Sequence, residues 1–184
     1  MSKLLKEQVI PIEINDNELF VRAILHPLFY SVRRGKLHLT VVLPPPGKKD
    51  VSVLRHDYTD DNFCKSHAKS LDIKQQEYCG LGLFKNSHVI QFSNQTEGVN
   101  VEVVATPLDK HKTLREDRPI LRTDRGLPMH ADLLYDLPPP KANEPNSPYI
   151  LFAGKLLKKL QYVSDPDPVN ELWVGKELVY VELE

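Results

Sequence analysis

The sequence predicts an α+β domain built mainly from an antiparallel sheet. Three observations indicate this class: short apolar segments alternate with polar residues, prolines stand where those segments end, and only two stretches have apolar residues at helical spacing. We expect eight or more strands, two helices covering one face of the sheet at about residues 60–73 and 148–162, and a C-terminal hairpin. With 184 residues, the chain is long enough to form a single domain over residues 1–184.

The first part of the chain has the pattern of strands joined by tight turns. Residues 15–17 (Asn-Asp-Asn) are a turn signal between two apolar segments, and Gly35 can supply the positive φ of a hairpin loop. Pro27 and Pro44 stand where strand patterns end. The strands predicted in this part cover residues 9–14, 18–25, 29–32, 36–43 and 51–55.

Strands continue to dominate the middle of the chain. We predict strands at residues 78–84, 88–93 and 99–106, and a further strand that begins at His130. Residues 107–129 have mixed charges, no aromatic residue and little periodicity. A long segment without regular structure is uncommon in a compact domain, so we expect a long irregular loop or a lid there.

The two helices are predicted from capping signals and apolar spacing. The first follows the N-cap candidates Thr59, Asp60 and Asp61. The second has Ser147 as its N-cap and Pro148 as its first residue. After it, Gly175 and Lys176 match the two-residue turn of a hairpin between the segments ELWV and ELVYVEL.

Composition excludes several function classes. The net charge of −1 argues against a nucleic-acid binder that relies on bulk charge, and there is no phosphate-binding glycine motif. No apolar run is long enough to span a membrane and no secretory signal is present, so we expect a cytoplasmic protein with Cys64 and Cys79 reduced. No cofactor is predicted.

Two similar segments contain the main candidates for chemistry. LHLTVVLPPP has His38 and Thr40, and MHADLLYDLPPP has His130 and Asp132. In a strand, residues i and i+2 share a face, so each segment would present an imidazole beside an oxygen. If the two strands lie side by side, these polar faces would meet.

The first segment, LHLTVVL, resembles the His-x-Thr motif of the 2H phosphoesterase family, which acts on 2′,3′-cyclic or 2′,5′-linked nucleotide ends without a metal. The resemblance implies that His38 and His130 act as base and acid, with Thr40 as a phosphate ligand. The second segment departs from the motif, because Asp132 replaces the expected Thr or Ser, and no helix precedes His38. Arg55 is a further candidate phosphate ligand, and Asp132 would orient an imidazole.

Other chemistry stays open at this point. Arg55 and Asp57 fit an ordinary ion pair on one strand face. Imidazole and carboxylate groups at His130, Asp132 and Asp136 could bind a metal, although their spacing matches no established metal motif and no metal is predicted. Cys64 could act as a nucleophile with His67, although a partly buried apolar role is typical of such a cysteine.

The sequence alone favours a small accessory or partner-binding module with a protein partner. The alternative is a metal-independent phosphodiesterase or RNase that uses paired histidines on a nucleotide or RNA end. Whether the protein is an enzyme, and its oligomeric state, are left open, and no membrane association is predicted.

Overall fold

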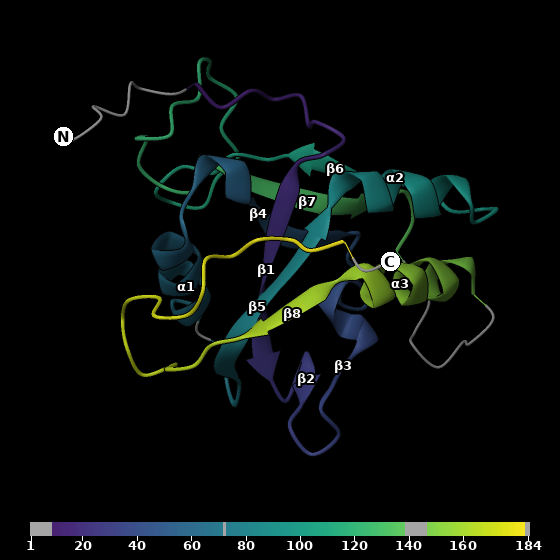
Figure 1. Cartoon of the computed structure of the whole chain (residues 1–184). Helices are drawn as coiled ribbons and strands as arrows, with labels where there is room; N and C mark the ends of the chain where they lie inside the picture. The colour runs from purple at the N-terminus through teal and green to yellow at the C-terminus, as the bar shows by residue number, and fades with distance from the viewer. Residues whose placement is uncertain (1–8, 72, 139–146, 183–184) are drawn as a thin grey trace.

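The fold is a six-stranded antiparallel sheet with helices on both faces, as Figure 1 shows for the computed structural model, in which residues 9–71, 73–138 and 147–182 are described. The sheet has the order β6-β7-β4-β1-β5-β8. Its strands are β1 (Leu19–His26), β4 (Asp50–Arg55), β5 (Glu77–Lys85), β6 (Val101–Ala105), β7 (His130–Tyr135) and β8 (Gln161–Ser164). A separate two-stranded sheet contains β2 (Tyr30–Ser31) and β3 (Lys36–Leu37). The helices are α1 (Asp61–Lys69), α2 (Asn86–Asn94) and α3 (Pro148–Lys159), with short 3₁₀ helices η1 (Leu39–Val41) and η2 (His56–Tyr58).

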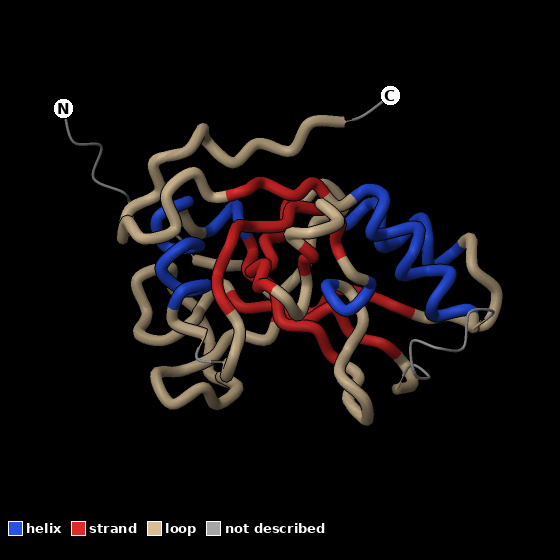
Figure 2. Tube along the Cα trace, turned by 90° about the horizontal axis from the view of Figure 1, so that it is seen from below, coloured by secondary structure: helices blue, strands red, loops and turns tan. Residues whose placement is uncertain are grey.

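Each face of the sheet has its own hydrophobic core. The larger core includes Phe20 and Phe84 from the sheet and Phe152 from α3. The smaller core, on the other face, includes Val21 from β1 and Cys64 from α1. Figures 1 and 2 show the strands between α1 on one side and α2 and α3 on the other. The α+β class is confirmed, but the expectation that the helices cover one face is wrong.

The principal sheet has six strands in the described part of the chain, not eight or more, and one predicted strand is a helix. Residues 88–93 lie in α2, where Val89 and Phe92 are buried. These two residues are three apart, so helical geometry brings both toward the core. A short apolar run fits both the alternating pattern of a strand and the spacing of a helix, which explains why a strand was predicted here.

The predicted helices are confirmed, with shorter bounds. Asp60 caps α1 by accepting a hydrogen bond from the Phe63 amide at 2.9 Å. In α3, Phe152, Ala153 and Leu156 form the buried stripe. The helix ends at Lys159, and the residues after Leu160 form β8 as an edge strand beside β5.

The segment that contains His38 is not the strand that the sequence predicts. β3 ends at Leu37, and His38 is the N-cap of η1. The turn allows Val41 to enter the larger core. His38 and Thr40 therefore lie on a 3₁₀ turn, and the strand periodicity that would align them with a second His strand does not apply. Of the second proline run, Pro139 and Pro140 lie outside the described residues.

The C-terminal hairpin is also contradicted. The described residues 165–182, called the C-terminal segment below, contain no strand. The backbone N–H groups of Trp173 and Leu178 donate to the side chains of Asn62 and Asp61 in α1, at 2.8 and 3.0 Å. Because these donors are satisfied by α1, they do not pair across a hairpin.

A buried ion pair also attaches the C-terminal segment to α1. Lys65 Nζ lies 2.9 Å from Asp165 Oδ2, and both side chains are 0% exposed. The same ammonium donates to the carbonyls of Asp167 and Leu172, at 2.8 and 3.0 Å. The segment is thus held by side chains of α1 without regular structure of its own.

Residues 107–129 contain only isolated bridges, such as Leu108 with Leu114. The segment is anchored by Ile120, which is buried in the smaller core. Arg115 forms ion pairs with Asp117 and Asp124 within the segment. Whether it acts as a lid stays a prediction. No described helix has both the length and the apolar character needed to cross a membrane.

Candidate functional site

A cavity opens where β1 and β4 diverge. The two strands are paired only at Phe20 with Arg55 and Val21 with Leu54, whereas β1 stays paired with β5 along its whole length. Beyond Val21 the gap leaves a cavity of about 170 Å³. A cavity must have a volume of roughly 10–15 Å³ to hold one water molecule, whereas pockets for drug-sized ligands have about 300–1,000 Å³. This β1–β4 cavity therefore has room for a small ligand.

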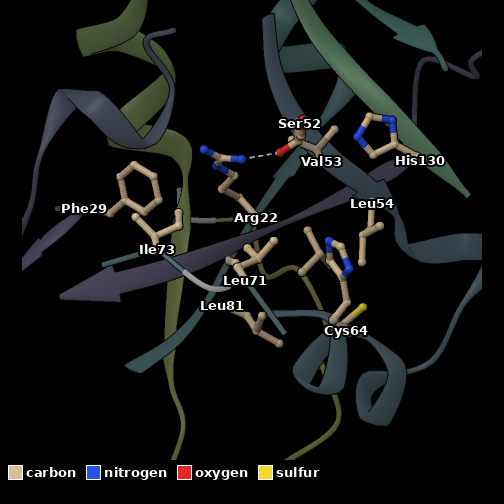
Figure 3. Close-up of a pocket in the computed structure, with 13 residues that line it drawn as sticks. Arg22, Phe29, Ser52, Val53, Leu54, Cys64, Leu71, Ile73, Leu81 and His130 are labelled. Atoms are coloured by element: carbon tan, nitrogen blue, oxygen red, sulfur yellow. Dashed lines mark hydrogen bonds between the residues drawn. The ribbon is translucent and has the colours of Figure 1, made fainter. Parts of the chain in front are cut away.

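Arg22 reaches into this gap from β1. Its Nη1 donates to the backbone carbonyl of Ser52 in β4 at 2.6 Å, a bond drawn in Figure 3. The guanidinium also lies over the Phe29 ring, 4.9 Å from its centroid. Burial lowers the pKa of Arg22 to about 10, opposed by the charge of Asp132, so the guanidinium stays charged at neutral pH.

Arg22 keeps unused hydrogen-bonding capacity. Its Nε is buried and has no hydrogen-bond partner among the described residues. An unpaired donor costs free energy when it is shielded from water. Because Arg22 is the arginine that lines the cavity, its guanidinium is the group there best suited to bind an added anionic oxygen.

His130 lines the cavity from β7 and is held in one orientation. Its Nδ1 lies 2.9 Å from both the carbonyl and the hydroxyl oxygen of Thr106. That hydroxyl donates to Asp132 Oδ2 at 2.7 Å, so its single proton is used. We therefore assign a proton to Nδ1, which donates to Thr106, so that Nε2 is the ring nitrogen that accepts when the ring is neutral.

Asp132 lies beside this imidazole. Its Oδ1 is 3.9 Å from His130 Nε2 and is buried without a hydrogen-bond partner among the described residues. The structure thus brings together two of the sequence-predicted residues, His130 and Asp132, and adds Thr106 between them.

His67 lines the same cavity from α1. Burial and the nearby charges of His130, Lys112 and Arg22 lower its pKa to about 4, so its ring is neutral at pH 7. Cys64 lies one turn earlier on α1 and is buried. Burial, with Asp61 and Asp60, raises the pKa of the Cys64 thiol, which opposes the thiolate that a nucleophile needs.

Arg55, the arginine proposed from sequence as a phosphate ligand, lies outside this cavity. Its Nε and Nη2 donate to the Glu18 carboxylate, and its Nη1 donates to the carbonyl of Pro11. Nη2 also donates to the Glu13 carbonyl at 3.2 Å. With a side chain that is 1% exposed and all three nitrogens engaged, Arg55 has the geometry of a structural residue.

His38 and Thr40 share a single backbone acceptor. His38 Nδ1 lies 3.2 Å from the Leu28 carbonyl, and the Thr40 hydroxyl donates to the same oxygen at 2.8 Å. Among the described residues, neither lines the β1–β4 cavity. The structure therefore does not bring His38 into the cavity that contains His130.

The metal alternative finds no support in the described residues, where no group of three or more His, Cys, Asp or Glu side chains could hold an ion. Asp136 instead accepts a hydrogen bond from the Tyr149 hydroxyl at 2.8 Å. Asp57 contributes to neither the cavity nor a metal group.

Sequence reasoning missed Arg22 and Thr106, and considered His67 only as a partner for Cys64. One signal was available, because Arg22 is a charged residue inside the apolar strand segment ELFVRAIL. The positions of Thr106 and His67 depend on the strand order, which the sequence pattern does not reveal.

Comparison with models of known protein families, with curated proteins and with solved structures finds no match to this chain. The functional argument therefore rests on the geometry of the β1–β4 cavity.

Proposed function

We propose that this chain is a binding module that holds a small ligand with an anionic group in the β1–β4 cavity. The observation that supports this most is Arg22, a charged group beside a cavity with an unpaired Nε. Apolar walls from Leu54, Leu71 and Ile73 would contact the remainder of the ligand.

The protonation state of His67 favours ligand binding over hydrolysis by two histidines. A general acid must hold a proton at the working pH, and a pKa of about 4 leaves His67 neutral at pH 7. His38, which the sequence analysis paired with His130, lies outside the cavity lining. The phosphodiesterase alternative stays a proposal with less support than binding.

Calorimetric titration with inorganic phosphate, short carboxylates and amino acids tests the proposal. We expect at least one of these probes to bind the wild-type chain, and Arg22→Gln to weaken that binding at least tenfold. Arg33→Gln, an exposed hairpin position, is the matched control and should bind normally. Absence of binding by every probe, or equal binding by R22Q, would contradict the proposal.

A protein partner is a second candidate, favoured by exposed apolar side chains on the C-terminal segment. Val169 is 87% exposed, and Leu172, Val174, Val179 and Val181 are each more than half exposed. Such a concentration of apolar surface is typical of a contact with another protein. A partner that copurifies with the wild-type chain should be lost from the double variant V179K/V181K. Retention of the partner by this variant would count against the segment as its docking surface.

A further inference from the structure

The β1–β4 cavity has a fixed charge of each sign beside it. Arg22 is positive, and Asp132 is close enough for its negative charge to raise the pKa of Arg22. Neither group is fully neutralised by hydrogen bonds, because Arg22 Nε and Asp132 Oδ1 are both buried without a partner among the described residues. Unpaired buried polar groups are rare in folded proteins and often mark a site where something binds.

The two charges are presented to the cavity in different ways. Arg22 lines the cavity directly, whereas Asp132 is not part of the lining and lies beside His130, whose Nε2 is 3.9 Å from Asp132 Oδ1. Since His130 Nδ1 donates to Thr106, Nε2 is the ring nitrogen that can accept a hydrogen bond when the ring is neutral. A cationic N–H donor bound to Nε2 would have the Asp132 carboxylate beside it as counter-ion.

We propose that the ligand is a small zwitterion, an amino acid with an apolar side chain, whose carboxylate binds Arg22 and whose ammonium binds His130 with Asp132 beside it. This inference rests on the proposed binding function and names its ligand class. The Asp132 charge supports it, because a carboxylate close to Arg22 favours a ligand that also carries an ammonium over a purely anionic one. Leu54, Leu71 and Ile73 would contact the apolar side chain.

Phosphate is a poorer match to this arrangement. A phosphate has no donor equivalent to an ammonium, so one of its oxygens would face the Nε2 lone pair and the carboxylate beside it. Like charges placed that close disfavour binding.

Titration with three matched probes tests the inference: leucine, 4-methylpentanoate, which lacks the amine, and 3-methylbutylamine, which lacks the carboxylate. We expect leucine to bind at least tenfold more tightly than either analogue. Asp132→Asn should weaken leucine binding about tenfold and leave 4-methylpentanoate binding unchanged or stronger. Arg22→Gln should weaken both. Asp50→Asn, an exposed position on the neighbouring strand β4, is the matched control.

The outcomes separate the two proposals. If 4-methylpentanoate or phosphate binds as tightly as leucine, or D132N binds leucine normally, the zwitterion inference is overturned while anion binding stands. If no probe binds the wild-type chain, both proposals fail. Far-ultraviolet circular dichroism and a urea titration of each variant show whether a loss of binding reflects loss of the fold.

Discussion

Arg55 and Arg22 lie on neighbouring strands of the same sheet and have opposite environments. Where β1 and β4 are paired, Arg55 is buried against the Glu18 carboxylate and two backbone carbonyls. Where the strands separate, Arg22 donates to the Ser52 carbonyl, and its Nε has no hydrogen-bond partner in the described part of the chain. The same residue type is held by an ion pair and backbone carbonyls where the strands are paired, and keeps hydrogen-bonding capacity where they separate, so strand pairing sets how fully each arginine is engaged.

Substitution of Arg55 should cause the largest loss of stability. Arg55→Met should lower the free energy of unfolding by about 3–5 kcal/mol, because it leaves the buried Glu18 carboxylate without its partner. Urea denaturation measures this loss. The double variant R55M/E18M should recover part of it, since no buried charge is then unpaired. A loss below about 1 kcal/mol in R55M would show that the pair is not structural.

His67 should make the stability of the folded chain sensitive to acid. Burial lowers the pKa of His67 from the usual 6.5 of histidine to about 4 in the folded chain, so the unfolded chain binds the proton more readily. The stability that His67 contributes is present above pH 6.5 and is lost as the pH falls toward 4. His67→Gln should reduce the acid loss by on the order of 2 kcal/mol, allowing for partial exposure of the ring.

His111→Gln is the control for that measurement, because His111 is exposed in the 107–129 segment. Urea midpoints measured at several pH values between 4 and 7 should show the reduced acid loss for H67Q only. Parallel pH profiles for the wild type and H67Q would contradict the lowered pKa.

The smallest effect on stability should come from Arg22 in the absence of ligand. Arg22→Met removes one hydrogen bond to a carbonyl and also removes an unpaired buried donor, so the net loss should be no more than about 1 kcal/mol. Comparing R22M and R55M in one urea series checks the contrast directly. Equal losses would mean that the two arginines do not differ in the way described.

The sequence predicted those elements whose causes are local. The α1 cap at Asp60 and the buried stripe of α3 are set by residues within a few positions of one another. The C-terminal hairpin was wrong because Trp173 pairs with Asn62, which is 111 residues away in the chain. No local pattern contains that partner.

The candidate site also contains residues that a local pattern predicts and residues that only the folded chain brings together. His130 and Asp132 could be proposed together because they are two residues apart in a strand. Arg22 and His67 line the same cavity as His130 only because β1 adjoins β4 and α1 packs against β1 in the folded chain, and because β1 leaves β4 after two residue pairs. Divergence of two strands has no signature in the composition of either one.

The pairing of Lys65 with Asp165 has a practical consequence for anyone who shortens or tags this chain. Deleting everything after β8 would remove residues 165–182, which as described contain no helix or strand, but it would also remove Asp165, the counter-ion of a wholly buried lysine. A lone buried ammonium destabilises a fold by several kcal/mol. We therefore expect a chain that ends before Asp165 to be less stable, although the residues removed contain no regular structure, and a fusion tag at this end should follow Glu184.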